Sequence, residues 1–205
     1  MNAQAFDRLM MARCIDLSKM SGKSGEYPYA AVICRDGKIV SESMNRVSHE
    51  HDVTRHAEIV AISLAQKALA TVSLDDCEIY INAEPCAMCS FAIRESRIRR
   101  VVYGLNSPHM GGTTKWNILP DTDLSKSMPE VFAPPPEITS GYMEQEVEQA
   151  LLEWSPLIAR IIRHRGLFGS APRVLTEILS VQPHSRGSRL LRFLRRNFFD
   201  FFGRR

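Results

Sequence analysis

The sequence of 205 residues lacks any run of about 18 apolar residues, the length that a membrane-spanning helix requires. Acidic and basic side chains occur throughout its first twenty residues, so we expect no secretory signal peptide and a cytoplasmic location. With 44% hydrophobic residues, the composition excludes a collagen-like chain and a wholly disordered one. The number of cysteines is not even, as a full set of disulfide pairs would require. The five that are present argue against a disulfide scaffold and favour metal binding or catalysis.

The chain has little net charge, +3 in total, and that charge is unevenly distributed. Seven arginines and a single acid follow residue 185, so residues 186–205 carry +6 and the remainder carries −3. By charge, only the C-terminal segment is typical of a nucleic-acid binder. We therefore divide the chain into a main domain at residues 1–168, a linker at 169–188 and a basic amphipathic tail at 189–205.

The tail places leucines and phenylalanines on one side of a helix and most of its arginines on the other. This pattern fits a helix that lies on an anionic membrane surface or docks on a partner. It also fits a basic arm that contacts RNA phosphates, or a segment without a specific role. The sequence leaves these interpretations open.

Hydrophobic periodicity predicts alternating helices and strands before the tail. The expected helices lie at residues 3–20, 56–69 (with Thr54 as N-cap), 86–96 and about 144–164. The expected strands lie at 30–40, as a hairpin turning at Asp36-Gly37, and at 74–83, 97–104 and 137–143. This alternation indicates a three-layer α/β domain. Residues 105–137 form a connection of unusual length, which is typical of a lid, a binding loop or a partner surface.

Two short motifs, His56-Ala57-Glu58 and Pro85-Cys86-Ala87-Met88-Cys89, each open a predicted helix. The two cysteines are three positions apart, so both sulfurs lie on one face near the positive end of the helix, which favours thiolates. With His56 they provide three protein ligands for zinc and leave the fourth position to water. Three ligands are typical of a catalytic zinc site, because structural sites have four.

Glu58 indicates which reaction such a site would catalyse. It lies two positions after His56, in the first turn of the same predicted helix, and can face the metal site without being a ligand. Zinc lowers the pKa of a bound water toward 7, and a nearby carboxylate can accept the proton and pass it to a departing amine. Structural zinc is one alternative interpretation. Another is a pair of buried cysteines with no metal.

The pattern H-x-E…P-C-x-x-C resembles the signature of the zinc-dependent cytidine and nucleobase deaminase superfamily. The resemblance covers about residues 5–105, and more weakly the helix after Gly141. Within the superfamily the sequence is similar to the branch that holds guanine deaminases and tRNA adenosine deaminases. The segments NRVSHEHDVTRHAEI and LDDC resemble guanine deaminases, whereas SRIRRVVYG and GYMEQEVEQALLEW resemble the tRNA-editing enzymes.

The resemblance implies an α/β/α sandwich with a mixed sheet, one zinc ion per chain and a homodimer. It implies that His56, Cys86 and Cys89 bind zinc, that Glu58 carries protons, and that the substrate contacts Asn45 and the backbone N–H of Ala57. Tyr29 stands where the family often has another residue, which would alter the edge of the pocket. Trp116 is a candidate to stack on a substrate base, although a tryptophan packed on the surface of the domain is the simpler interpretation.

We therefore predict hydrolytic removal of an exocyclic amine from a nucleobase or nucleoside, with release of ammonia. A small substrate of the guanine type is the favoured interpretation, and adenosine in tRNA is the alternative. A zinc module without catalytic activity is a third hypothesis, against which the presence of Glu58 argues.

Overall fold

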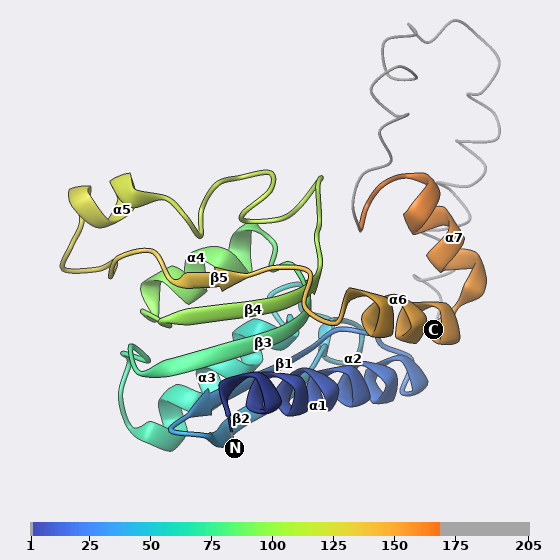
Figure 1. Ribbon diagram of the computed structural model, residues 1–205, viewed down its shortest axis with the longest axis horizontal. Coiled ribbons are helices and arrows are strands. Elements are labelled where there is room, and N and C mark those ends of the chain that lie inside the picture. The colour runs from blue at the N-terminus through green and yellow to red at the C-terminus, as the bar shows by residue number, and fades with distance from the viewer. Residues whose placement is uncertain (1, 169–205) are drawn as a thin grey trace, which may run out of the picture. The chain divides into compact units, whose positions relative to one another are not determined.

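The computed structural model describes residues 2–168, and the expected linker and tail at residues 169–205 lie outside this range. Five strands form a single sheet in the order β2-β1-β3-β4-β5 (Figure 1). Their bounds are Ala30–Arg35 for β1, Lys38–Met44 for β2, Cys77–Ala83 for β3, Arg100–Leu105 for β4 and Glu137–Thr139 for β5. The sheet is mixed, because β1 pairs antiparallel with β2 and β3, whereas β3, β4 and β5 run parallel.

The hairpin between β1 and β2 turns at the two residues that the sequence indicated. Asp36 and Gly37 have φ angles of 50° and 72°, the left-handed backbone that a two-residue hairpin turn requires. Asp tolerates this conformation and Gly adopts it freely, so the Asp-Gly pair favours the turn and fixes the register of the two strands. The predicted hairpin is confirmed.

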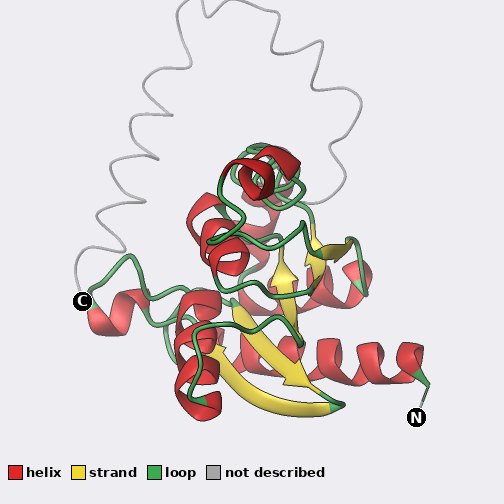
Figure 2. Ribbon diagram, turned by 90° about the vertical axis from the view of Figure 1, so that its left-hand side faces the viewer, coloured by secondary structure: helices red, strands yellow, loops and turns green. Residues whose placement is uncertain are grey.

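Helices cover both faces of the sheet (Figures 1 and 2). Helices α1 (Ala3–Lys23) and α6 (Glu144–Trp154) lie on one face, and α3 (Ala57–Leu69) and α4 (Ala87–Glu95) lie on the other. Successive residues of β1 alternate between the two buried clusters, since side chains along a strand point to opposite faces. The predicted three-layer α/β/α sandwich with a mixed sheet is thus confirmed. Cys14, Cys34 and Cys77 belong to these two cores.

The predicted helix at residues 144–164 is wrong as a single helix. The structure has α6 up to Trp154 and a separate helix, α7, over Pro156–His164. Pro156 has no N–H to donate and disfavours helical backbone at Ser155, which is extended with φ −157° and ψ 101°. The Ser155 hydroxyl then accepts from the Ile158 N–H at 3.4 Å and caps the new helix.

Thr54 is not the N-cap of α3, and that prediction is also wrong. The Thr54 N–H and hydroxyl both donate to one oxygen of Asp52, at 2.8 and 2.6 Å, and His56 occupies the cap position with extended backbone. Two further short helices lie in stretches expected to be irregular: α2 over Val47–Glu50 and α5 over Thr122–Ser127. Within residues 2–168, no helix has both the length and the apolar character to cross a membrane.

Candidate active site

The N-termini of α3 and α4 meet at the carboxyl ends of the parallel strands β3 and β4. His56 is the N-cap residue of α3, and Cys86 is the N-cap residue of α4. Cys89 follows in the first turn of α4, where its side chain is fully buried. The positive end of a helix stabilises negative charge within its first turn, so α4 favours thiolates at both cysteines. Ligands of open α/β sheets bind at this end of the strands.

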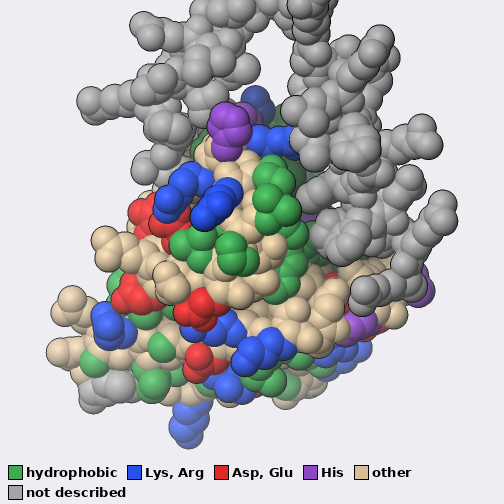
Figure 3. Space-filling view, turned by 90° about the vertical axis from the view of Figure 1, so that its right-hand side faces the viewer, with side chains coloured by type: hydrophobic (Ala, Val, Ile, Leu, Met, Phe, Trp, Pro, Cys, Tyr) green, Lys and Arg blue, Asp and Glu red, His purple; other side chains and the backbone are tan. Residues whose placement is uncertain are grey.

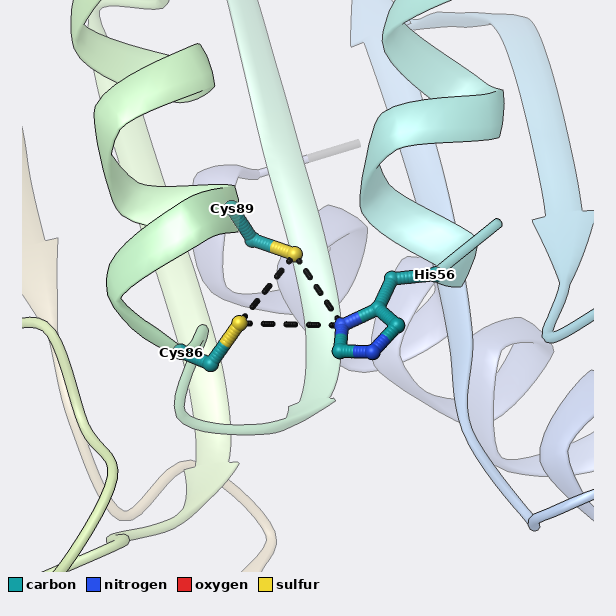
Figure 4. A group of neighbouring side chains, drawn as sticks. All are labelled: His56, Cys86 and Cys89. Atoms are coloured by element: carbon teal, nitrogen blue, oxygen red, sulfur yellow. Dashed lines mark hydrogen bonds between the residues drawn. The ribbon is translucent and has the colours of Figure 1, made fainter. Parts of the chain in front are cut away.

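The side chains of His56, Cys86 and Cys89 point toward one another (Figure 4). The Cys86 sulfur lies 3.6 Å from the Cys89 sulfur and 3.6 Å from His56 Nδ1, and the Cys89 sulfur lies 3.4 Å from the same nitrogen. Zinc bonds of about 2.3 Å to sulfur and about 2.05 Å to nitrogen place tetrahedral ligands about 3.5–3.8 Å apart. The three ligand atoms therefore fit one tetrahedral zinc ion with a fourth position available.

The surroundings of Cys86 and Cys89 change the pKa values of both thiols. The hydrogen bond between the Cys86 and Cys89 thiols, together with a contact to His56, lowers the pKa of Cys86 to about 4 despite partial burial. The same bond to Cys86, together with burial, raises the pKa of Cys89. The site thus presents a thiolate at neutral pH, the form of cysteine that binds zinc.

Glu58 lies in the first turn of α3 and lines the same pocket as His56 and Cys86. Only 6% of the residue is exposed. Burial raises the pKa of the Glu58 carboxyl, and the nearby His56 ring acts in the opposite direction. A raised pKa favours the protonated form of the carboxyl, and the group can then both accept and donate a proton, as a general acid and base requires.

The pocket contains most of the residues that the sequence singled out. Besides His56, Glu58 and Cys86, it is lined by Tyr29 and Asn45. Residues that sequence reasoning missed also line it: Ile81, Ala83, Glu84, Ser107, Met110 and Phe168.

Three candidates from the sequence do not line the pocket: Ala57, Trp116 and Cys89, whose sulfur lies against Cys86 and His56. Ala57 is buried at the first position of α3, where a helix leaves its N–H without an intrahelical partner. Trp116 is 56% exposed in the segment after β4, and its ring lies 5.8 Å from the Lys115 ammonium group. Trp116 is therefore not part of the described pocket wall.

Asn45 is held in place by a second buried carboxylate. Its side-chain N–H donates to Glu26 Oε2 at 2.9 Å, and the other oxygen of Glu26 accepts from the His49 N–H at 2.7 Å. These hydrogen bonds lower the pKa of Glu26 although burial opposes them, so the carboxylate stays ionised. The amide of Asn45 consequently has a fixed orientation at the wall of the pocket.

Three ligands that fit zinc, beside a buried carboxyl group in a pocket of a three-layer sandwich, are the properties of a zinc-dependent deaminase. Comparison with known proteins agrees. Residues 4–105 match the model of the cytidine and deoxycytidylate deaminase zinc-binding region. The chain belongs to this family, and it is a zinc-dependent nucleobase deaminase with one zinc site.

Similar proteins include two kinds of deaminase. The chain is 33% identical over 142 residues to the tRNA-specific adenosine deaminase of Agrobacterium fabrum, a match that covers 67% of this chain and 86% of that protein. It is 46% identical over 76 residues to the guanine deaminase of Bacillus subtilis, covering 37% of this chain and 49% of that protein. The chain also superposes on a solved structure from a study of A-to-I editing by tRNA:A34 deaminases at the wobble position. The TM-score is 0.61 and the sequence identity is 32%, and the match covers 70% of this chain and 99% of that one.

Proposed function

We propose that this protein deaminates adenosine to inosine in transfer RNA. The observation that carries the proposal is the extent of the likeness to tRNA adenosine deaminases, which covers 86% of one such protein and 99% of a solved structure. The comparisons support this alternative better than the guanine-type substrate that the sequence favoured, because the match to a guanine deaminase covers 49% of that protein.

His56, Cys86 and Cys89 would hold the zinc ion, which would supply Lewis acidity to activate water at an amine-bearing ring carbon. Glu58 would accept a proton in the first step and donate it to the departing amine. Its burial supports this role, because a proton held in the pocket is not lost to bulk water. The presence of Glu58 beside the three ligands also argues against a zinc module without catalytic activity.

Asn45 and Tyr29 would bind the target base. Asn45 offers a hydrogen-bonding amide whose orientation Glu26 fixes. The Tyr29 ring lies 6.1 Å from the Phe168 ring, so two aromatic side chains line one side of the pocket. Aromatic faces favour the stacking of a flat heterocycle. The N–H of Ala57, at the N-terminus of α3, would face the ring as the family resemblance implies.

The charges on the described surface are mixed, so they do not single out one region for RNA binding. On the face seen in Figure 3, basic and acidic side chains are interspersed among hydrophobic ones. Several of the arginines pair with acids, as Arg163 does with Glu148. The tail, with its charge of +6, would then provide phosphate contacts, and this role and the expected homodimer stay predictions.

The test is a panel of substrates incubated with the full-length, zinc-loaded protein. The panel contains guanine, guanosine, cytosine, cytidine, adenine and a tRNA with adenosine at position 34. We expect ammonia release only with the tRNA, and inosine at position 34 when the product is sequenced. Cys86→Ala is the control and should lose zinc and activity together. Turnover of guanine without any change in the tRNA would overturn the proposal.

Guanine deamination is the second candidate, and one observation favours it. The local identity to the guanine deaminase, 46%, exceeds the 33% identity to the tRNA-specific enzyme, although over fewer residues. The same panel separates the two candidates.

A further inference from the structure

Glu84 lies between the end of β3 and the zinc-ligand motif, and its carboxylate is buried. Only 5% of the residue is exposed. One carboxylate oxygen accepts from the Ser107 N–H at 2.6 Å and from the Thr114 hydroxyl at 2.9 Å. The other accepts from the N–H groups of Thr113 and Thr114, at 2.9 and 2.8 Å. Four donors from one segment therefore converge on a single side chain.

Among the described residues, no lysine, arginine or histidine forms an ion pair with Glu84. Its negative charge is instead stabilised by the dipoles of three backbone N–H groups and one hydroxyl. Burying a carboxylate without such donors would be costly, so the segment must keep this conformation for the charge to remain satisfied. The carboxylate and the segment fix each other.

The same segment, residues 107–114, also contacts the two residues of the zinc motif that follow Glu84. Gly111 forms an isolated β-bridge with the zinc-ligand residue Cys86, and the Gly112 N–H donates to the Pro85 carbonyl at 2.8 Å. A Cβ atom at Gly111 would lie 2.2 Å from the Glu84 carboxyl group, so only glycine fits at this approach. The segment is packed directly on the motif that holds the metal.

Two residues of the segment, Ser107 and Met110, line the pocket. The Ser107 N–H is bound by Glu84, and its hydroxyl is buried without a hydrogen-bond partner in the described part of the chain. The Met110 N–H donates to the Ser107 carbonyl at 3.2 Å, so the position of Met110 follows from that of Ser107. One wall of the pocket is therefore placed by the contact to Glu84.

We propose that Glu84 is a positioning residue of this deaminase: its carboxylate holds residues 107–114 against the zinc motif and so forms the substrate-facing wall of the pocket. Glu84 also borders the pocket, but its carboxylate oxygens are engaged by the donors of residues 107–114, so it acts through Ser107 and Met110. Loss of the carboxylate should loosen the wall while the three zinc ligands stay in place, because those ligands lie on α3 and α4. The proposal rests on the deaminase site and does not depend on which base the enzyme accepts.

The test is Glu84→Gln in the full-length, zinc-loaded protein. A glutamine has one acceptor oxygen, and its NH₂ group would face N–H donors. We expect amide hydrogen exchange in residues 105–117 to accelerate by roughly tenfold or more, the factor that loss of one hydrogen bond to a charged group corresponds to. Zinc content should remain near one per chain, and exchange in β1 should not change. This part of the experiment needs no substrate, so it holds whether or not tRNA is the substrate.

Kinetics on whichever substrate the wild type turns over provides the second readout. A wall that binds ground state and transition state alike should raise KM roughly tenfold when it loosens, with kcat changed less than about threefold. Thr114→Val, which removes one of the four donors with little change in shape, should move both readouts in the same direction by a smaller factor. It serves as the second variant if Glu84→Gln does not fold.

Glu78→Gln is the matched control. Glu78 lies at the start of β3, where its carboxylate accepts from the Tyr80 hydroxyl and pairs with Arg99 and Arg100, away from the pocket. The Glu78→Gln variant should be less stable, but amide hydrogen exchange in residues 105–117 and KM should not change. The proposal is overturned if Glu84→Gln leaves that exchange unchanged, or if it loses zinc as Cys86→Ala does. Faster exchange with KM and kcat both unchanged would overturn it as well.

Discussion

At the scale of single residues, Glu58 combines burial with a place beside the zinc ligands, and its substitution separates chemistry from metal binding. Glu58→Gln keeps the size of the side chain and cannot accept a proton. We expect the variant to fold and to retain zinc while turnover falls about 10²–10⁴-fold, the usual contribution of a positioned acid–base group. Elemental analysis and ammonia release measure the two properties. Normal turnover in this variant would exclude Glu58 as the proton carrier.

A second single residue, Asp7, connects α1 to the sheet. Its two carboxylate oxygens accept from the Arg100 guanidinium, both at 2.7 Å, and one also accepts from the Tyr80 hydroxyl at 2.6 Å. The hydrogen bond with Arg100 lowers the pKa of Asp7 below its value in the unfolded chain. This group therefore stabilises the fold fully above the unfolded-state pKa of about 3.9, and the stabilisation is lost as pH falls through the folded-state pKa.

We expect Asp7→Asn to lower the free energy of unfolding at pH 7 by about 1.5–3 kcal/mol, because a largely buried arginine loses two charged hydrogen bonds and keeps only its ion pairs with Glu78 and Glu137 among the described residues. Below about pH 4 the difference between variant and wild type should shrink. Urea unfolding at several pH values measures both effects. Asp123→Asn, at an exposed site where Asp123 pairs with Lys126, should change stability by less than about 0.5 kcal/mol at any pH. A difference for Asp7→Asn that is constant down to pH 3 would contradict this account.

Residue types in the zinc motifs were enough to predict which side chains meet, because the chemistry of zinc restricts its ligands. Glu84 and Phe168 were not predicted. The partners of Glu84 lie 23 to 30 residues further along the chain, and periodicity describes only local structure. Glu84 does stand directly before Pro85 in the motif. An acidic residue between a buried strand and the zinc motif was a signal that could have marked Glu84 as a candidate site residue. Phe168 reaches the pocket through the course of α6 and α7, which no local pattern encodes.

At the scale of elements, α4 organises the long connection after β4 through a buried arginine. The Arg94 guanidinium, in a residue that is 2% exposed, donates to the carbonyls of Leu119, Asp121 and Ala133 and to the Ser125 hydroxyl. The planar fork of arginine matches several acceptors at fixed angles, whereas a lysine ammonium group is compact and has three donors. One side chain therefore joins four groups that are up to 14 residues apart in this connection.

We expect Arg94→Lys to lower the free energy of unfolding by about 2–4 kcal/mol, since buried carbonyls lose their donors. Chemical denaturation measures this change in the free energy of unfolding. Arg97→Lys is the control, because Arg97 is only half-buried and its hydrogen bonds to the carbonyls of Pro129 and Glu130 lie at the surface. Its effect should stay below about 1 kcal/mol. An equal loss in the two variants would show that burial of Arg94 is unimportant.

The order of helices and strands was predictable because each carries its own apolar pattern, and the Asp36-Gly37 turn has a local cause. The ends of elements were less predictable. Continuous apolar spacing extended across Ser155, although Pro156 was a visible signal to end the helix there. At Thr54, the nearer Asp52 took the hydrogen bonds that a cap would have used. In the connection at 105–137, the structure depends on Glu84 and Arg94, which lie on other elements.

At the scale of the whole molecule, the boundary between enzyme domain and tail stays a prediction, and Phe168 determines where to test it. Truncation after Gly169 keeps Phe168 against Tyr29, and we expect unchanged zinc content and an unchanged kcat on the substrate that the full-length protein turns over. Truncation after Leu167 removes a wall of the pocket and should raise KM. If the first truncation abolishes activity, the tail is part of the active site or of a subunit contact, and the division proposed from the sequence is wrong.

The two ligand sulfurs, 3.6 Å apart and one of them a thiolate at neutral pH, are also the reactants of disulfide formation. Bonded sulfurs lie about 2.05 Å apart, so a small movement would join Cys86 to Cys89. Bound zinc engages both sulfurs and should protect them. With a chelator present, we expect hydrogen peroxide to oxidise this pair to a disulfide and itself be reduced to water, with loss of two titratable thiols that dithiothreitol restores. The zinc-loaded chain should keep both, and the buried Cys14, Cys34 and Cys77 should not react in either state. Oxidative stress would then inactivate the enzyme reversibly whenever its metal supply fails.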